Sequence, residues 1–115
     1  LALPALLRAQ KLQKRAARDG FDWPDTDGPE AKIIEEIEEL KSAPAEMMEE
    51  EAGDLLFAAV NFVRAHGIDA ESALRAANAK FERRYRAMEG KAAGGFAELS
   101  LDQQEALWQA VKRDE

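Results

Sequence analysis

Two groups of carboxylates are the part of this sequence best suited to chemistry. The first group has the spacing E-E-x-x-E, and the second, about a dozen residues later, has the spacing E-x-x-D. Residues three or four apart share one face of a helix, so each group would gather its acids on one side of a helix. Like charges at this spacing repel each other unless water or a cation offsets the repulsion. The acids are Glu35, Glu36 and Glu39 in the first group and Glu51 and Asp54 in the second.

The rest of the composition restricts the chemistry to oxygen ligands. The chain has no cysteine and a single histidine, His66, which excludes thiolate sites, cysteine nucleophiles and a di-iron site with two Glu-x-x-His motifs. It also lacks a glycine-rich phosphate loop ending in Lys-Ser or Lys-Thr. Mg²⁺, with Mn²⁺ as the alternative ion, prefers carboxylates and typically binds together with substrate phosphates. The acids therefore indicate either a wet, solvated helix face or a metal site for a polyphosphate.

Length and charge describe a single acidic domain. We expect residues 1–115 to form one domain, and the start at Leu1 suggests that it is excised from a longer chain. The net charge of −7 argues against nucleic-acid binding. No stretch approaches the roughly 20 apolar residues of a membrane span, and no signal peptide is evident. A cytoplasmic location is the expectation for such a cysteine-free chain.

Proline, glycine and capping residues divide the chain into helices, with no strand signal. Ser100 and Gln103 form a capping box, and the run KAAGGFAE before them predicts a flexible loop. The sequence thus predicts an all-α fold of four to five helices. The first expected helix runs from Pro4 to Asp19 before Gly20, and the second starts at a cap at Asp27 or Gly28. Ser42, Ala43 and Pro44 break the pattern and start a third helix that ends near His66, before Gly67. The fourth runs from Asp69 to Met88 or Glu89 before Gly90, and the last begins at Ser100.

The third expected helix favours the metal-site interpretation. Its segment LLFAAVNFV is apolar nearly all the way round, which is typical of a helix buried on more than one side. Such a helix is either central in the domain or, as we expect here, packed against a second subunit. A polar stripe leads into this segment. Unpaired carboxylates there would cost several kcal/mol each, so they must meet a basic side chain or a metal ion. The stripe consists of Glu50, Glu51, Asp54 and Asn61.

Three other features each allow two interpretations. By helical phase, the buried side of the second helix is lined by Ile33, Ile37 and Leu40, with Ile34 beside them. Its glutamates lie largely opposite, either on a solvated face or at a metal ion. The aromatic residues Phe21 and Trp23 either anchor their loop on the core or wall a base-binding pocket. Basic residues on the flank of the fourth helix either pair with glutamates of neighbouring helices or reach a ligand. These basic residues are Lys80 and Arg84.

Five blocks of this sequence together resemble the MazG family of nucleoside triphosphate pyrophosphohydrolases. The resemblance is to the C-terminal catalytic domain of two-domain bacterial members. It implies an all-α domain that forms a helical bundle with a second subunit, as a homodimer or higher oligomer. It also implies Mg²⁺-dependent hydrolysis of NTPs or dNTPs to the monophosphate and pyrophosphate, by water attack at the α-phosphorus, in nucleotide-pool housecleaning. The blocks are GFDWPD, IIEEIEEL, EEEAGDLLFAAVNF, NAKFERRYR and LWQAVK.

The resemblance also implies roles for individual residues. The implied metal ligands are Glu35, Glu36, Glu39, Glu51 and Asp54, with Glu50 as a neighbouring candidate. The implied catalytic residues are Glu36, Glu39 and Glu51, and which of them is the general base stays open. The implied substrate-binding residues are Asn61, Lys80, Arg84, Trp108 and Lys112.

Two rival functions are compatible with the same residues. One is a non-catalytic helical dimerisation or regulatory module of a larger protein, which the all-round apolar third helix would suit. The other keeps the metal but acts on a single nucleotide, such as a deoxyuridine or modified-base triphosphate. Base and sugar preference are not fixed by the sequence.

Overall fold

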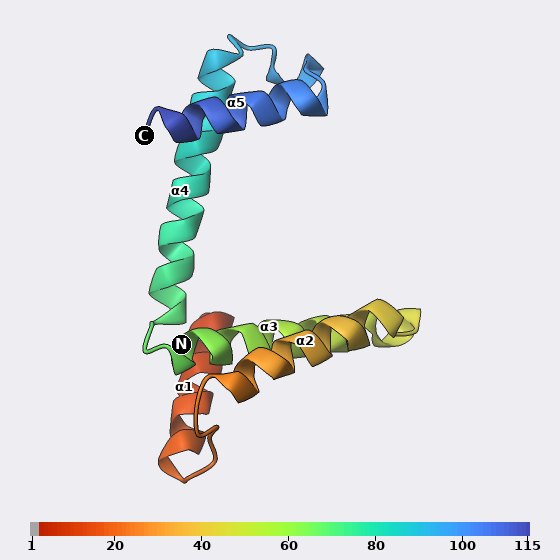
Figure 1. Ribbon diagram of the computed structural model, residues 1–115, viewed down its shortest axis with the longest axis vertical. Coiled ribbons are helices and arrows are strands. Elements are labelled where there is room, and N and C mark those ends of the chain that lie inside the picture. Colours follow the sequence, from red (N-terminus) through yellow and green to blue (C-terminus); the bar gives the residue numbers. More distant parts are fainter. Residues whose placement is uncertain (1–2) are drawn as a thin grey trace. The chain divides into compact units, whose positions relative to one another are not determined.

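A computed structural model describes residues 3–115, and all of their regular structure is helical (Figure 1). This confirms the predicted all-α class. None of these helices is both long and apolar enough to cross a membrane. Residues 1–73 and residues 74–115 form two compact units, which are described separately below. The elements are α1 (Ala5–Arg18), α2 (Asp27–Ser42), η1 (Ala45–Met47), α3 (Met48–Ala65), α4 (Ala70–Lys91), η2 (Phe96–Glu98) and α5 (Leu101–Arg113).

In the first unit, α2 and α3 lie side by side and α1 packs on α3 (Figure 1). The connection between α2 and α3 is short, so the two helices run antiparallel. Pro44, which has a fixed φ and no N–H, comes just before the 3-10 turn η1, and α3 begins only at Met48. The predicted start of the third helix at Pro44 is therefore early by one turn. The antiparallel pair places residues near the middle of α2 opposite the first turns of α3.

The ends of the first three helices largely follow the expected signals. Gly20 and Gly67 have φ of +90° and +75°, in the left-handed region expected of glycines after a helix. The predicted cap of the second helix at Asp27 or Gly28 is wrong by one or two residues, because the N-cap is Thr26. The backbone N–H of Asp27 instead donates to the side chain of Asp25. The side chain of Asp25, in the loop before α2, therefore satisfies a backbone donor in the first turn of this helix.

The buried side of α2 differs from the prediction. Glu36 is only 4% exposed, whereas Ile34 and Ile37 are 59% and 41% exposed. The covered side of α2 is mixed, because Ile33 and Leu40 are half-buried beside Glu36, whereas Glu35 and Glu39 are exposed. The interpretation of these glutamates as a solvated face is therefore wrong for Glu36. Ile34 and Ile37 are left largely exposed on the other side of the helix.

Asp69 caps α4, as predicted, and is held by a buried glutamine of α1. The backbone N–H of Ser72 donates to Asp69 Oδ2 at 2.9 Å. Gln10 donates from Nε2 to Asp69 Oδ1 and accepts from the N–H of Ala70 with Oε1, so both ends of its amide are used. Hydrogen bonds from Ser72, and then from Gln10, lower the pKa of Asp69 to about 2.

This low pKa predicts a pH-dependent contribution to stability. A carboxyl whose pKa is depressed on folding stabilises the fold above its unfolded pKa of about 3.9, and this stabilisation is lost as the pH falls towards 2. We expect Asp69→Asn to lower the melting temperature by a few degrees at pH 5 and to have a smaller effect at pH 2. Thermal unfolding followed by circular dichroism would measure both. An equal decrease at the two pH values would contradict the assignment.

In the second unit, α4 and α5 meet through aromatic and buried apolar residues. Phe81 lies 5.9 Å from the ring of Trp108, and Met88 and Val111 are buried. The predicted end of the fourth helix before Gly90 is wrong, because α4 continues to Lys91. A helix tolerates an interior glycine at a cost of about 1 kcal/mol. The chain turns instead at Ala93 and Gly94, which have positive φ, and the predicted loop contains η2.

The last helix begins as predicted. Ser100 accepts from the N–H of Gln103 at 3.1 Å, and the Gln103 side chain accepts from the N–H of Ser100 at 2.8 Å. This reciprocal capping box satisfies two backbone donors at the start of α5. The cap fixes where α5 starts, and hence which of its side chains face α4.

Candidate functional site

Three carboxylates meet between α2 and α3. Glu36, Glu51 and Asp54 each offer one carboxylate oxygen, and these three oxygens lie within 4.8 Å of one another. Within residues 3–115, the buried Oε2 atoms of Glu36 and Glu51 have no hydrogen-bond partner. Lys32 approaches the cluster, with its Nζ 3.2 Å from Glu36 Oε1. Buried, unpartnered carboxylate oxygens are costly unless a cation binds them, so this donor set fits a hard divalent ion.

The neighbouring acids add negative charge without joining the cluster. The charge of Glu36 raises the pKa of Glu39, and desolvation together with Glu51 and Glu35 raises that pKa further. Glu35 is exposed and pairs with Lys32 at 3.0 Å, while Glu50 is exposed at the start of α3. Of the five predicted metal ligands, the structure gathers three, places Glu39 beside them and leaves Glu35 at the edge.

A cavity of about 630 Å³ adjoins the carboxylates. Its lining comes from α1, the following loop, α2 and α3. The loop contributes Phe21 and Trp23, and Phe21 is 82% exposed. A side chain this exposed does not anchor the loop on a core, so that interpretation is wrong for Phe21. Glu36 and Asp54 also line the cavity, so one ligand could contact an aromatic wall and the acidic cluster together.

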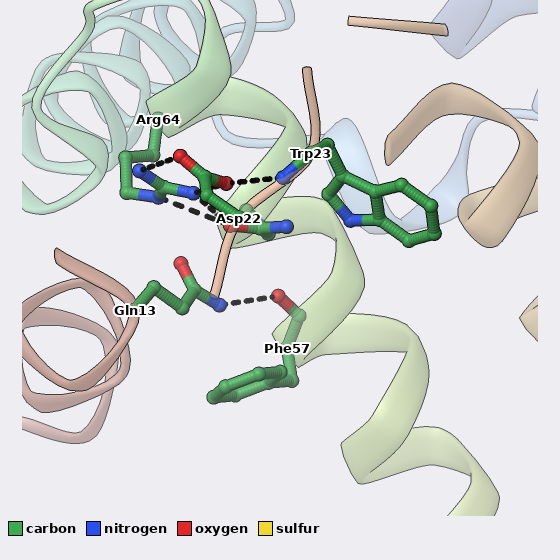
Figure 2. A network of polar contacts seen from close by, with 6 residues as sticks. Gln13, Asp22, Trp23, Phe57 and Arg64 are labelled. Atoms are coloured by element: carbon green, nitrogen blue, oxygen red, sulfur yellow. Dashed lines mark hydrogen bonds and ion pairs between the residues drawn. The ribbon is translucent and has the colours of Figure 1, made fainter. Parts of the chain in front are cut away.

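Arg64 holds the loop to α3 through a network that the sequence did not indicate (Figure 2). Its guanidinium donates to Asp22 Oδ1 at 2.7 Å and to Asn61 Oδ1 at 2.8 and 3.0 Å. Asp22 Oδ1 also accepts from the N–H of Trp23 at 2.8 Å. These bonds, chiefly those from Arg64, lower the pKa of Asp22. The i, i+3 spacing of Asn61 and Arg64 was a local signal, but nothing local pointed to Asp22.

Trp23 rests directly on the first turn of α2. A Cβ atom added to Gly28 would lie 2.3 to 2.9 Å from three atoms of the Trp23 ring. Real Cβ atoms do not approach a ring so closely, so any larger residue at this position would displace the indole. The absence of a side chain at Gly28 therefore sets the position of one wall of the cavity.

The remaining predicted ligand contacts lie in the second unit. Arg84 Nε and Nη2 each donate to a carboxylate oxygen of Glu115 at 2.8 Å, and the guanidinium lies 5.2 Å from the Trp108 ring centroid. Arg84 therefore pairs with a glutamate, although Glu115 follows the end of α5 and does not lie on a neighbouring helix as expected. Lys80 is near enough to help lower the pKa of Glu115, although Arg84 is the main cause. Lys112 is exposed on α5.

The carboxylates that meet here lie in a segment that matches a known domain. The sequence profile of the MazG nucleotide pyrophosphohydrolase domain matches residues 30–88, about half of the chain. The chain belongs to this family. The matched segment of the MazG domain contains all five predicted metal ligands together with Asn61, Lys80 and Arg84. Helix α1 and the loop that carries Phe21 and Trp23 lie outside the matched segment.

Two relatives extend the MazG similarity over nearly the whole chain. A nucleoside triphosphate pyrophosphohydrolase of Escherichia coli K12 is 49% identical over 124 residues, which cover 99% of this chain and 47% of the relative. A nucleoside triphosphate pyrophosphohydrolase/pyrophosphatase MazG of Thermotoga maritima is 44% identical over 115 residues, which cover 96% and 45%. The chain spans about half the length of these curated relatives. An uncharacterised Bacillus subtilis protein, YabN, is 41% identical over 68 residues, covering 56% of this chain and 14% of YabN.

Proposed function

We propose that this domain hydrolyses nucleoside triphosphates, NTPs or dNTPs, to the monophosphate and pyrophosphate. The observation that carries the proposal is the cluster of Glu36, Glu51 and Asp54, in which two buried oxygens lack a partner among residues 3–115. Two of its members, Glu36 and Asp54, border a cavity of about 630 Å³. The names of the E. coli and T. maritima relatives support the same activity. A nucleotide-pool housecleaning role is part of this proposal.

Glu36, Glu51 and Asp54 would hold a Mg²⁺ ion, with Mn²⁺ as the alternative, and Glu35 remains a peripheral candidate ligand. When bound, such an ion supplies positive charge to the phosphate oxygens and lowers the pKa of a bound water. We propose that one of the carboxylates Glu36, Glu39 and Glu51 accepts the proton of the attacking water, and that the others hold the ion.

The second unit offers groups for the phosphates. Arg84 already binds the two oxygens of a carboxylate, and the same planar fork suits two oxygens of a phosphate. We propose that Arg84 and Lys80 bind phosphate oxygens, and that Trp108 and Lys112 contribute to substrate binding. We also propose that a second copy covers the apolar side of α2 and α3, where Ile34 and Leu56 are exposed.

Metal and nucleotide together are expected to stabilise the domain. A ligand at 100 times its dissociation constant adds about 2.7 kcal/mol, which corresponds to a rise of roughly 10 °C in melting temperature for a domain of this size. Differential scanning fluorimetry with Mg²⁺ and a non-hydrolysable nucleoside triphosphate would measure it. Release of pyrophosphate should then be screened across the eight ordinary NTPs and dNTPs.

The same experiment separates the rival functions. A non-catalytic dimerisation module would show neither the thermal shift nor pyrophosphate release with any of the eight nucleotides. Release from only one nucleotide would favour the single-substrate variant. The control is Mg²⁺ with inorganic sulfate, because a shift of equal size would indicate general anion binding rather than a nucleotide site.

A further inference from the structure

We infer that Gln13 determines specificity by accepting a hydrogen bond from the nucleobase, with Asn61 as the donor beside it. This inference rests on the proposed function and deepens it, because it names the part of the substrate that the cavity recognises. The two side chains come from α1 and α3 and line the same cavity as the carboxylates. Gln13 lies outside the segment that matches the MazG profile.

The amide of Gln13 is buried and held in one orientation. Gln13 is only 7% exposed, and its Nε2 donates to the backbone carbonyl of Phe57 at 3.0 Å (Figure 2). Because that bond needs the N–H₂ group, the carbonyl oxygen must lie on the other branch of the amide. In this orientation the buried Oε1 has no hydrogen-bond partner within residues 3–115. A buried acceptor without a partner is costly, so it is expected to be satisfied by a ligand or by water.

The amide of Asn61 is held in one orientation as well. Its Oδ1 accepts two bonds from Arg64, which is itself fixed by Asp22. The donor Nδ2 is therefore on the opposite branch from Arg64. In an α-helix the N–H of residue 61 points to the carbonyl of residue 57, the same carbonyl to which Gln13 donates. Gln13 and Asn61 are thus neighbours, and they offer a fixed acceptor and a fixed donor.

The walls of the cavity suit a planar ring. Phe21, Trp23 and Phe57 contribute aromatic surface, and Trp23 is positioned by Gly28. Pockets with apolar walls and a few fixed polar groups bind flat, amphipathic ligands such as heteroaromatic rings. The charged groups Lys32, Glu36 and Asp54 also line this cavity, which suits a ligand with phosphates attached to the ring.

The chemical class that fits is a base with a hydrogen-bond donor next to an acceptor. Adenine and cytosine offer an exocyclic amino group beside a ring nitrogen, and guanine, uracil and thymine offer a ring N–H beside a carbonyl. The donor of the base would meet Gln13 Oε1, and its acceptor would meet Asn61 Nδ2. The pair therefore allows any ordinary base and rejects a base that lacks the donor, because the buried oxygen of Gln13 would then stay unsatisfied.

The test compares two monophosphates that differ only in this donor. Adenosine monophosphate carries the 6-amino group, and purine riboside monophosphate does not. Isothermal titration calorimetry in EDTA would measure their binding without any hydrolysis. We expect the wild-type domain to bind adenosine monophosphate about tenfold more tightly. We expect Gln13→Met, which is similar in size and has no acceptor, to bind both with nearly equal affinity.

A matched control is available in the second unit. Gln104 donates from Nε2 to the carbonyl of Phe96 at 3.0 Å, the same kind of contact that Gln13 makes with Phe57. Gln104→Met should leave the tenfold preference unchanged. Gln13→Met removes the unsatisfied acceptor and also the bond to the Phe57 carbonyl, which in the helix still faces the N–H of residue 61. Because these two losses act in opposite directions, the helical circular dichroism and melting temperature should stay close to those of the wild type.

Three results would overturn the inference. They are equal affinity of the wild type for the two monophosphates, an unchanged preference in Gln13→Met, and no detectable binding of either compound. Failure of the proposed function looks different. If the domain releases no pyrophosphate from any nucleotide but keeps the Gln13-dependent preference, the base site stands and the proposed hydrolysis does not.

Discussion

Glu36→Gln is expected to lower the rate of pyrophosphate release by at least about a hundredfold and to leave the helical circular dichroism unchanged. Glu36 is buried, and its Oε2 is one of the two unpartnered carboxylate oxygens in the cluster with Glu51 and Asp54. An amide of the same shape keeps the packing but removes the charge that a divalent ion requires. Glu39→Gln and Asp54→Asn are expected to act in the same direction.

The stability of Glu36→Gln provides an independent signature. Without metal, the variant should melt close to the wild-type temperature, because the loss of one of several mutually repelling charges offsets the loss of the ion pair with Lys32. With Mg²⁺ and a non-hydrolysable nucleotide, it should lose the thermal shift. The control is Glu38→Gln on the same helix, where the side chain is exposed and lies 3.9 Å from Lys41. Wild-type activity in Glu36→Gln would rule out this cluster as the site.

Arg64→Met is expected to destabilise the domain by about 2 kcal/mol and to weaken nucleotide binding about tenfold. The Arg64 side chain is 13% exposed and is the only donor recorded for Asn61 Oδ1 within residues 3–115. Its loss leaves Asn61 free to turn and releases Asp22, and with it the loop that carries Trp23. Asp22 is about one-third exposed, so water compensates part of the loss and the low end of the range for charged hydrogen bonds applies.

Chemical denaturation and calorimetry would measure these two effects. Arg86→Met is the matched control, because Arg86 makes an exposed ion pair with Glu82 at 3.3 Å on α4. Exposed pairs of this kind contribute little, so the control should stay within about 0.5 kcal/mol of the wild type. If Arg64→Met were as stable as the control and bound nucleotide equally well, the network would not order the pocket.

The features that the sequence predicted correctly are those that depend on neighbouring residues. Helix positions, the capping box at Ser100 and the cap at Asp69 follow from signals a few residues apart. The meeting of Glu51 with Asp54 follows from the i, i+3 spacing in the same way. Their approach to Glu36 was a weaker expectation, because it also requires α2 and α3 to run antiparallel with the acids facing inward.

The features that the sequence did not predict depend on pairings between distant segments. Helical phase could not decide which side of α2 faces α3, so the buried position of Glu36 and the exposure of Ile37 were missed. Arg64 meets Asp22 from 42 residues away, and Gln13 meets Phe57 from 44 residues away. Such polar pairs leave no periodic trace in the sequence. The end of α4 was also missed, because an interior glycine such as Gly90 costs a helix only about 1 kcal/mol and does not by itself end it.

The contact of Trp23 with Gly28 fixes where the aromatic wall of the cavity lies along α2. Gly28 and Glu36 belong to one helix and are eight residues apart, which corresponds to about 12 Å along its axis. Trp23 and Glu36 line the same cavity, so the ring at one turn of α2 and the carboxylate at another face a common space. Helix α2 therefore sets the spacing between the aromatic wall and the acidic cluster, and a single ligand with a ring and a charged group is suited to contact both.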